Sequence, residues 1–112
     1  MKPFLFLAAA AMALLPAAGA NAAAGDTPDM HDAKCVVVMV NMGQKQTDET
    51  AKNSFNGVML YFVGKLSGRH TAAEVGGLIA AAEKALAPAD YQAVGGECAQ
   101  EMMKVGDILQ GK

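Results

Sequence analysis

An apolar stripe of helical period runs through residues 47–69, and it restricts the fold more than any other feature of the chain. The stripe consists of Ala51, Phe55, Val58, Met59, Phe62 and Leu66. Its members recur at steps of three and four residues, the spacing of one helix face. Thr47 can cap the start of this helix, and Gly68 suits the left-handed conformation common after a helix end. Because little of its second half is polar, we expect it to be the central helix of an all-α bundle.

A first helix is expected before this one. Thr27 can serve as its N-cap with Pro28 at the first helical position, and Gly43 would stop it after Met42. The β-branched run at 35–40 also fits a buried strand. No second strand-like run is available to pair with it, so the sequence favours a helix.

Two more helices are expected after the central one. Thr71 and Glu74 have the spacing of a capping box, which predicts a helix from there to just before Pro88. Pro88 then opens a last helix that Gly111 stops. Gly95 and Gly96 weaken this helix, either because the first helix approaches closely there or because the helix kinks.

The first 24 residues have the pattern of a cleaved secretory signal peptide. Lys2 precedes an apolar stretch at 4–15, and small residues follow with cleavage motifs ending at Ala22 and at Ala24. A retained membrane anchor is the alternative, but the apolar stretch is shorter than the ~20 residues of a spanning helix. No cysteine follows the cleavage region, which argues against a lipoprotein. The sequence thus predicts a signal peptide at 1–24, one helical domain at 25–112, and a periplasmic or secreted location.

The two cysteines, Cys35 and Cys98, both lie in the expected mature domain. An even count and an oxidising compartment indicate one disulfide, which would join the first and last helices. Its chain-entropy contribution is about 4 kcal/mol for a loop of roughly 64 residues. Two free thiols, or a bridge between two chains, are the alternatives. We therefore predict a small four-helix bundle with one disulfide.

Charge and composition exclude several classes of partner. Removal of Lys2 with the signal leaves eight Lys and Arg against eleven Asp and Glu, a net charge of about −3 with no run of like sign. There is no basic stripe for nucleic acid and no cationic amphipathic face for anionic lipid. No membrane span is expected after signal cleavage.

Metal and catalytic sites have little support in the sequence. His31 and Cys35 share a helix face near Met30, Met39 and Met42, a possible soft-metal set, but none of the usual geometries is matched. Ser67 and His70 lie close together in a predicted interhelical turn with no third group to complete a triad. We expect no catalytic residue, no metal, no cofactor and no enzymatic activity.

Large apolar side chains exceed what one small bundle needs to hide. The surplus predicts a dimer seam or a surface that binds other proteins. A tightly filled core with Tyr61 partly exposed is the alternative. The residues expected on such a surface are Phe55, Met59, Tyr61, Phe62, Met102 and Met103.

Two resemblances to known proteins follow from these residues. The apolar run after Cys35, the phrase from Tyr61 to Arg69, the capped third helix and Cys98 resemble a group of small exported helical proteins of proteobacteria, which implies no activity. More weakly, Cys35, Cys98 and the segment after Cys98 resemble periplasmic acid-stress chaperones of the HdeA type. That resemblance implies a dimer that loosens at low pH and exposes apolar helix faces to unfolded clients.

Three functions are therefore considered, in order of preference. The first is a non-enzymatic interaction or structural role in the cell envelope, with another protein or a second copy as partner. The alternative is an acid-stress chaperone. An enzyme or metal carrier ranks third, because the residues for it are lacking.

Overall fold

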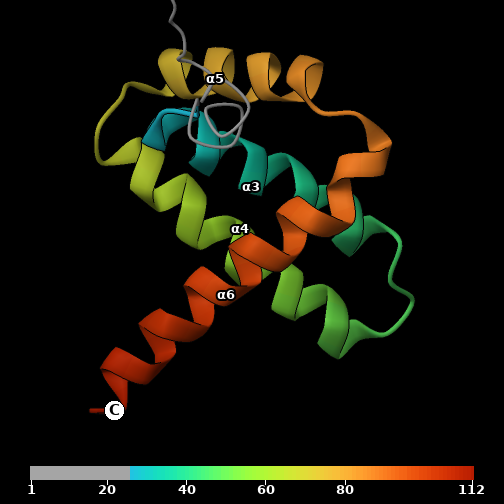
Figure 1. Cartoon of the computed structure of the whole chain (residues 1–112), viewed down its shortest axis with the longest axis vertical. Coiled ribbons are helices and arrows are strands. Elements are labelled where there is room, and N and C mark those ends of the chain that lie inside the picture. The colour runs from blue at the N-terminus through green and yellow to red at the C-terminus, as the bar shows by residue number, and fades with distance from the viewer. Residues whose placement is uncertain (1–25) are drawn as a thin grey trace, which may run out of the picture.

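Four α-helices make up the domain in this computed structural model, which describes residues 26–112 (Figure 1). The structure confirms the predicted all-α fold, and the run at 35–40 is helical rather than a strand. The predicted signal peptide lies outside the described residues. The helices are α3 (Pro28–Gln44), α4 (Glu49–Ser67), α5 (Ala72–Ala85) and α6 (Tyr91–Leu109), with a 3-10 turn, η2 (Pro88–Asp90), before α6.

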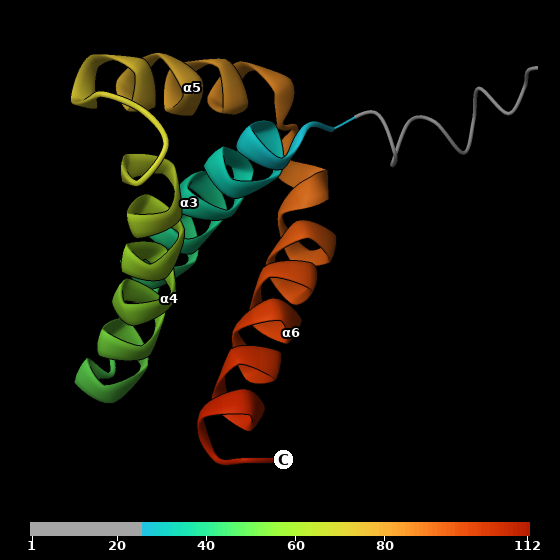
Figure 2. The ribbon, with the colours of Figure 1, turned by 90° about the vertical axis from the view of Figure 1, so that its left-hand side faces the viewer.

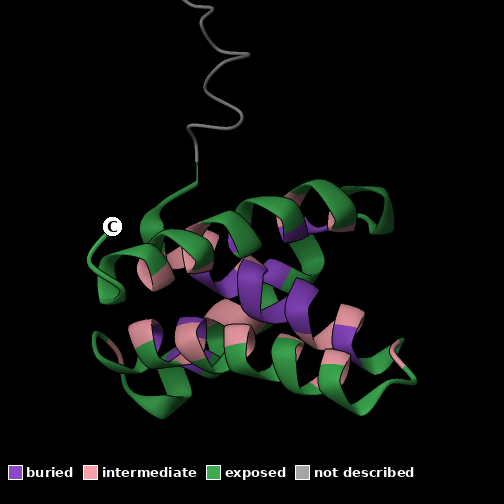
Figure 3. Cartoon of the chain, turned by 90° about the horizontal axis from the view of Figure 1, so that it is seen from below, coloured by how far each residue is buried: buried purple, intermediate pink, exposed green. Residues whose placement is uncertain are grey.

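The centre of the domain is α3, and the prediction that residues 47–69 form the central helix is wrong. The other three helices all pack against α3, and Figure 2 shows α5 crossing above α3, α4 and α6. Most of the buried residues, coloured purple in Figure 3, belong to α3, whereas the buried residues of α4 are only Phe62 and Leu66. A helix that is apolar on most sides is buried from most sides, and the valine-rich run of α3 has that composition. Its buried apolar residues are Ala33, Cys35, Val36, Val37, Val38 and Met39.

Side-chain caps fix the starts of the first three helices. The Thr27 hydroxyl accepts a hydrogen bond from the Met30 backbone N–H at 3.1 Å, as predicted. At α5 the predicted capping box is present, since the Glu74 N–H donates to the Thr71 hydroxyl and the Thr71 N–H donates to the Glu74 carboxylate. The cap of α4 is Asp48 rather than Thr47, because the Asp48 carboxylate accepts from the Ala51 N–H.

Two predicted helix ends are wrong. Gly43 lies inside α3, which continues to Gln44. A Cβ atom at Gly43 would lie 3.2 Å from the Cβ atom of Phe55, so glycine there allows α4 to approach. Gly68 has a right-handed backbone with φ −72°, and its N–H donates to the Gly64 carbonyl at 3.0 Å, so α4 ends without a left-handed residue.

The last helix begins one turn later than predicted. Pro88 opens η2, and the Asp90 carboxylate accepts a hydrogen bond from the Ala87 N–H at 3.1 Å. The α-helix itself starts at Tyr91. A Cβ atom at Gly95 would lie 2.8 Å from Met42 Sδ and 3.3 Å from Val38 Cγ1. Close approach of α3, one of the two explanations predicted for this glycine, therefore accounts for Gly95.

Candidate functional site

One disulfide joins the first and last described helices, as predicted. Cys35 and Cys98 are fully buried, with an S–S distance of 2.00 Å and a Cα–Cα distance of 5.7 Å. There is no free cysteine among residues 26–112. The soft-metal alternative therefore loses its thiolate, although His31 Nε2 lies only 3.8 Å from Cys35 Sγ.

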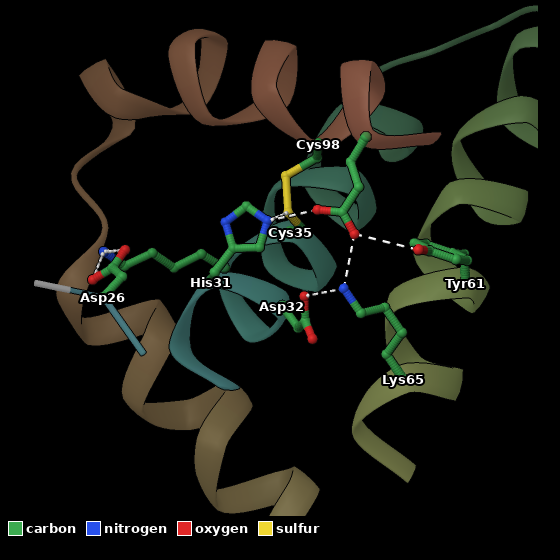
Figure 4. Close-up of a disulfide and its surroundings, with 9 residues drawn as sticks. Asp26, His31, Asp32, Cys35, Tyr61, Lys65 and Cys98 are labelled. Atoms are coloured by element: carbon green, nitrogen blue, oxygen red, sulfur yellow. Dashed lines mark hydrogen bonds and ion pairs between the residues drawn. A yellow bond between two sulfur atoms is a disulfide. The ribbon is translucent and has the colours of Figure 1, made fainter. Parts of the chain in front are cut away.

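Beside the disulfide lies a network of charged side chains from α3, α4 and α6 (Figure 4). Its most buried member is Asp32 of α3, whose side chain is 1% exposed. The Arg69 guanidinium donates to Asp32 Oδ2 at 2.9 Å, and Lys65 Nζ lies 3.0 Å from Asp32 Oδ1. The Lys65 contact is an ion pair without hydrogen-bond geometry. A buried carboxylate is tolerated only with such partners, so Asp32 fixes the end of α4 against α3.

Glu101 brings α6 into the same network. Lys65 Nζ donates to Glu101 Oε2 at 2.8 Å, and the Tyr61 hydroxyl donates to the same oxygen at 3.3 Å. The His31 ring lies 3.0 Å from Glu101 Oε1. The Lys65 ammonium therefore joins a carboxylate of α3 to a carboxylate of α6.

A third carboxylate, Asp29, ties the link after α4 to the start of α3. It accepts two hydrogen bonds from Arg69, at 2.7 and 3.0 Å, and lies 2.7 Å from His70 Nε2. We call the whole set the ion-pair network. Its members are Asp29, His31, Asp32, Tyr61, Lys65, Arg69, His70 and Glu101.

The network holds two of its carboxylates, those of Asp29 and Glu101, in the charged form. Burial alone would raise the pKa of Glu101, but the hydrogen bonds from Lys65 and His31 outweigh burial and lower that pKa. Burial opposes the charge of Lys65, yet contacts with Glu101 and Asp32 raise its pKa. The hydrogen bonds from Arg69 and then from His70 lower the pKa of Asp29. The folded domain therefore favours these charges.

Three members of the network have the spacing of a metal site. One ligand atom each from His31, Asp32 and Glu101 lies within 4.8 Å of the others. The Lys65 ammonium, however, contacts both carboxylates and supplies the positive charge that a cation would bring. As built, the cluster is a structural ion-pair network.

A pocket of about 690 Å³ opens next to the network, between the start of α3 and α6. Its lining includes four carboxylates, those of Asp26, Asp32, Asp90 and Glu97, against the ammonium groups of Lys34 and Lys65. Lys34 pairs with Asp26 and Lys65 pairs with Asp32, so the lining is acidic on balance.

The polar residues of the link between α4 and α5 serve structure. The His70 ring contacts Asp29 and lies 3.6 Å from a Glu74 carboxylate oxygen, rather than turning to Ser67. Among the described residues, no nucleophile is therefore paired with a base at this link.

The residues predicted for an apolar surface are only partly at the surface. Phe62 is fully buried in the core against α3, so it cannot belong to that surface. Phe55, Met59, Tyr61 and Met102 are half-buried, and only Met103 is mostly exposed, at 66%.

Sequence reasoning did not place the two most exposed large apolar residues on this surface. Ile108 and Leu109 near the end of α6 are 72% and 82% exposed, and Leu60 of α4, counted in the apolar surplus, is 61% exposed. Leu109 continues the apolar stripe of α6 and therefore resembles a core residue. The C-terminal half of α6 extends away from the other helices, so the end of its stripe has no helix to pack against (Figures 1 and 2). The only sequence signal for this exposure was the length of the stripe.

No family model, no curated protein and no solved structure matches this chain. The two resemblances described above stay predictions. No helix among residues 26–112 is long and apolar enough to cross a membrane.

Proposed function

We propose that this protein is a non-enzymatic interaction protein of an oxidising, extracytoplasmic compartment, and that it docks proteins on the C-terminal half of α6. One observation carries the proposal. Large apolar side chains of α6 are mostly exposed where this helix leaves the bundle, at Met103, Ile108 and Leu109. Contiguous exposed apolar side chains are typical of protein-binding surfaces.

The disulfide and the predicted signal peptide support the compartment. Disulfides persist in the periplasm and outside the cell, and they are rare where thiols are kept reduced. The bond between Cys35 and Cys98 is part of the core, as expected of a permanent structural link. The fold is therefore suited to a periplasmic or secreted protein.

The non-enzymatic part of the proposal is supported by the use of the polar side chains. Both histidines and the buried carboxylate belong to the ion-pair network, where each contacts a charged side chain of another segment. Groups engaged in this way hold helices together, which leaves the apolar surface of α6 as the feature available for function.

Site-specific photo-crosslinking in the source cell tests this proposal. A photoreactive phenylalanine analogue replaces Ile108, and the matched control replaces Glu83, which is exposed on α5. We expect protein adducts, to this chain or to others, from position 108 and few from position 83. An equal yield from the two positions would refute docking on α6.

An acid-stress chaperone is the second candidate, and the ion-pair network is the observation that favours it. Glu101 contacts α3 through His31 and α4 through Tyr61 and Lys65, and its folded pKa is lowered. The stabilisation that goes with a lowered pKa is present above the unfolded value and is lost as pH falls through the folded value. Acid would therefore weaken the attachment of α6 and expose apolar surface beneath it.

Light scattering with a hydrophobic dye, from pH 7 to pH 2, tests this second candidate. A chaperone of this kind would bind more dye reversibly as the pH falls, with a change of mass if it is a dimer. A particle of constant mass that binds no additional dye would exclude the acid-stress role.

A further inference from the structure

The sulfur atoms of the domain differ widely in their access to solvent. Residues 26–112 contain both cysteines and six of the eight methionines. The cysteines form the buried disulfide, so this part of the chain has no free thiol that would react first with an oxidant. Of its six methionines, only Met103 is mostly exposed, at 66%. The thioether of Met103 is therefore the reduced sulfur most accessible to a dissolved oxidant.

The other five methionines of this region are covered to a larger extent by the bundle. Met39 is 2% exposed in the core. The sulfur atom of Met42 packs against α6, since a Cβ atom at Gly95 would lie only 2.8 Å from it. Exposure even separates Met103 from the methionine that precedes it in the chain. The half-buried methionines are Met30, Met42, Met59 and Met102.

The place of Met103 on α6 accounts for its exposure. A helical side chain lies over the turn that precedes it, which at this position contains Ala99 and Gln100. Both residues are exposed, and the alanine side chain is too small to cover a thioether. From this point α6 extends away from the other helices, so none of them covers Met103 (Figure 2).

We propose that Met103 is an oxidation site, which a hydroperoxide such as hydrogen peroxide converts to methionine sulfoxide while the domain stays folded. The sulfur lone pair attacks one peroxide oxygen, the O–O bond breaks and hydroxide leaves. The hydroxide then takes the proton from the transferred oxygen, so the products are the sulfoxide and water. A methionine sulfoxide reductase can restore the thioether, which makes the modification reversible.

Oxidation makes α6 more polar at Met103 without disturbing the core. A sulfoxide is polar where the thioether is apolar, and the exposed side chain keeps it in water. A partner that covered the sulfoxide would remove it from water, which costs free energy unless a new hydrogen bond replaces the lost one. Oxidation of Met103 therefore weakens docking on this part of α6. This consequence rests on the proposed function, whereas the selective oxidation of Met103 does not.

Peptide mass spectrometry of the exported, disulfide-bonded protein tests the oxidation site. The folded protein is treated with hydrogen peroxide, and sulfoxide is measured at each methionine over time. We expect Met103 to react at least about fivefold faster than the adjacent Met102, because oxidation follows exposure. The melting temperature should stay within about 3 °C after oxidation of Met103, as is usual for a change at the surface. A smaller ratio of rates, faster oxidation of any other methionine of residues 26–112, or a larger loss of stability would overturn the inference.

Photo-crosslinking in the source cell tests the effect on docking. The photoreactive phenylalanine analogue replaces Gln100, which is exposed and lies on the same side of α6 as Met103. Peroxide should lower the adducts from position 100 at least about fivefold in the native chain, since a buried sulfoxide is costly. Met103→Leu is the matched control, because leucine keeps an apolar side chain without sulfur, and its adducts should not fall.

Two results would refute the effect on docking. One is an equal response of the native chain and Met103→Leu to peroxide. The other is adduct formation from Ile108 but not from Gln100, which would leave docking on α6 intact and show that the partner does not reach Met103. Failure of the proposed function is a separate result, since adducts would then be missing at both positions while the peptide measurement still decides the oxidation site.

Discussion

Removing the disulfide is the perturbation whose cost can be worked out most directly. The bond joins residues separated by 63 positions, so it closes a loop of most of the described chain. The chain-entropy relation gives about 14 cal/mol/K for such a loop, or about 4 kcal/mol at 25 °C. Domains of this size have a total stability of only about 5 kcal/mol or somewhat more, so this one bond is a large part of the whole.

The assay is urea unfolding followed by circular dichroism, with the double variant Cys35→Ala/Cys98→Ala. Alanine is preferred to serine because both sites are fully buried and a hydroxyl there would lack a partner. We expect the free energy of unfolding to fall by about 4 kcal/mol and the melting temperature to fall by roughly 15–30 °C. If the double variant is unfolded in plain buffer, its unfolding and that of the native protein are both measured in the same stabilising osmolyte.

The native protein with reductant is the control. It loses the crosslink but keeps both buried sulfur atoms, so its loss isolates the effect of the loop. Amide exchange should then increase first in α6, because only its N-terminal half packs closely on the bundle. A loss below about 1.5 kcal/mol, with α6 as protected as α3, would refute this reasoning and show that non-covalent contacts hold α6.

Three further predictions concern single side chains. Lys65→Met leaves a buried carboxylate with one cation fewer and should cost about 2 kcal/mol in urea unfolding, below the usual cost of a broken buried pair because Lys65 is 32% exposed. The matched control is Lys52→Met, which removes an exposed ion pair with Glu49, 3.9 Å long, on the same helix and should cost less than about 0.5 kcal/mol. Equal losses of stability in Lys65→Met and Lys52→Met would contradict a stabilising role for the ion-pair network. Glu101→Gln should lower stability at pH 7 and flatten its decline below about pH 5, since the folded pKa of Glu101 lies below its ordinary value of 4.5; an unchanged pH profile would count against this. Gly96→Ala should raise stability by about 0.5–1 kcal/mol. Gly95→Ala should not, because its Cβ atom would lie 2.8 Å from Met42 Sδ and 3.3 Å from Val38 Cγ1; a gain at both positions would show that these side chains can turn away at little cost.

Local signals explain the parts of the fold that could be predicted. The capping box of Thr71 and Glu74 and the proline at the start of α3 act within one helical turn, so they can be seen in a short stretch of sequence. The disulfide was predictable because the expected domain has only Cys35 and Cys98.

The candidate site could not be predicted in the same way. Asp32 and Lys65 are 33 positions apart, and neither the sequence around Asp32 nor that around Lys65 indicates a partner. Glu101 and Lys104 are three positions apart, a spacing that predicts an ion pair on the exposed face of a helix. In the structure Glu101 instead accepts a hydrogen bond from Lys65 of α4. Long-range ion pairs depend on how helices pack, and that packing is not encoded at any one position.

The sequence by itself determined the helices, most of their caps and the single covalent link, because hydrophobic period, capping chemistry and cysteine count are local or countable properties. Only the tertiary structure decided that α3 is the centre, that Phe62 is buried and that Leu109 is exposed. An apolar stripe indicates which side of a helix avoids water, but it does not indicate how much of that side a neighbouring helix covers. That length is set by the packing of all four helices together, and in α6 it leaves Met103, Ile108 and Leu109 uncovered.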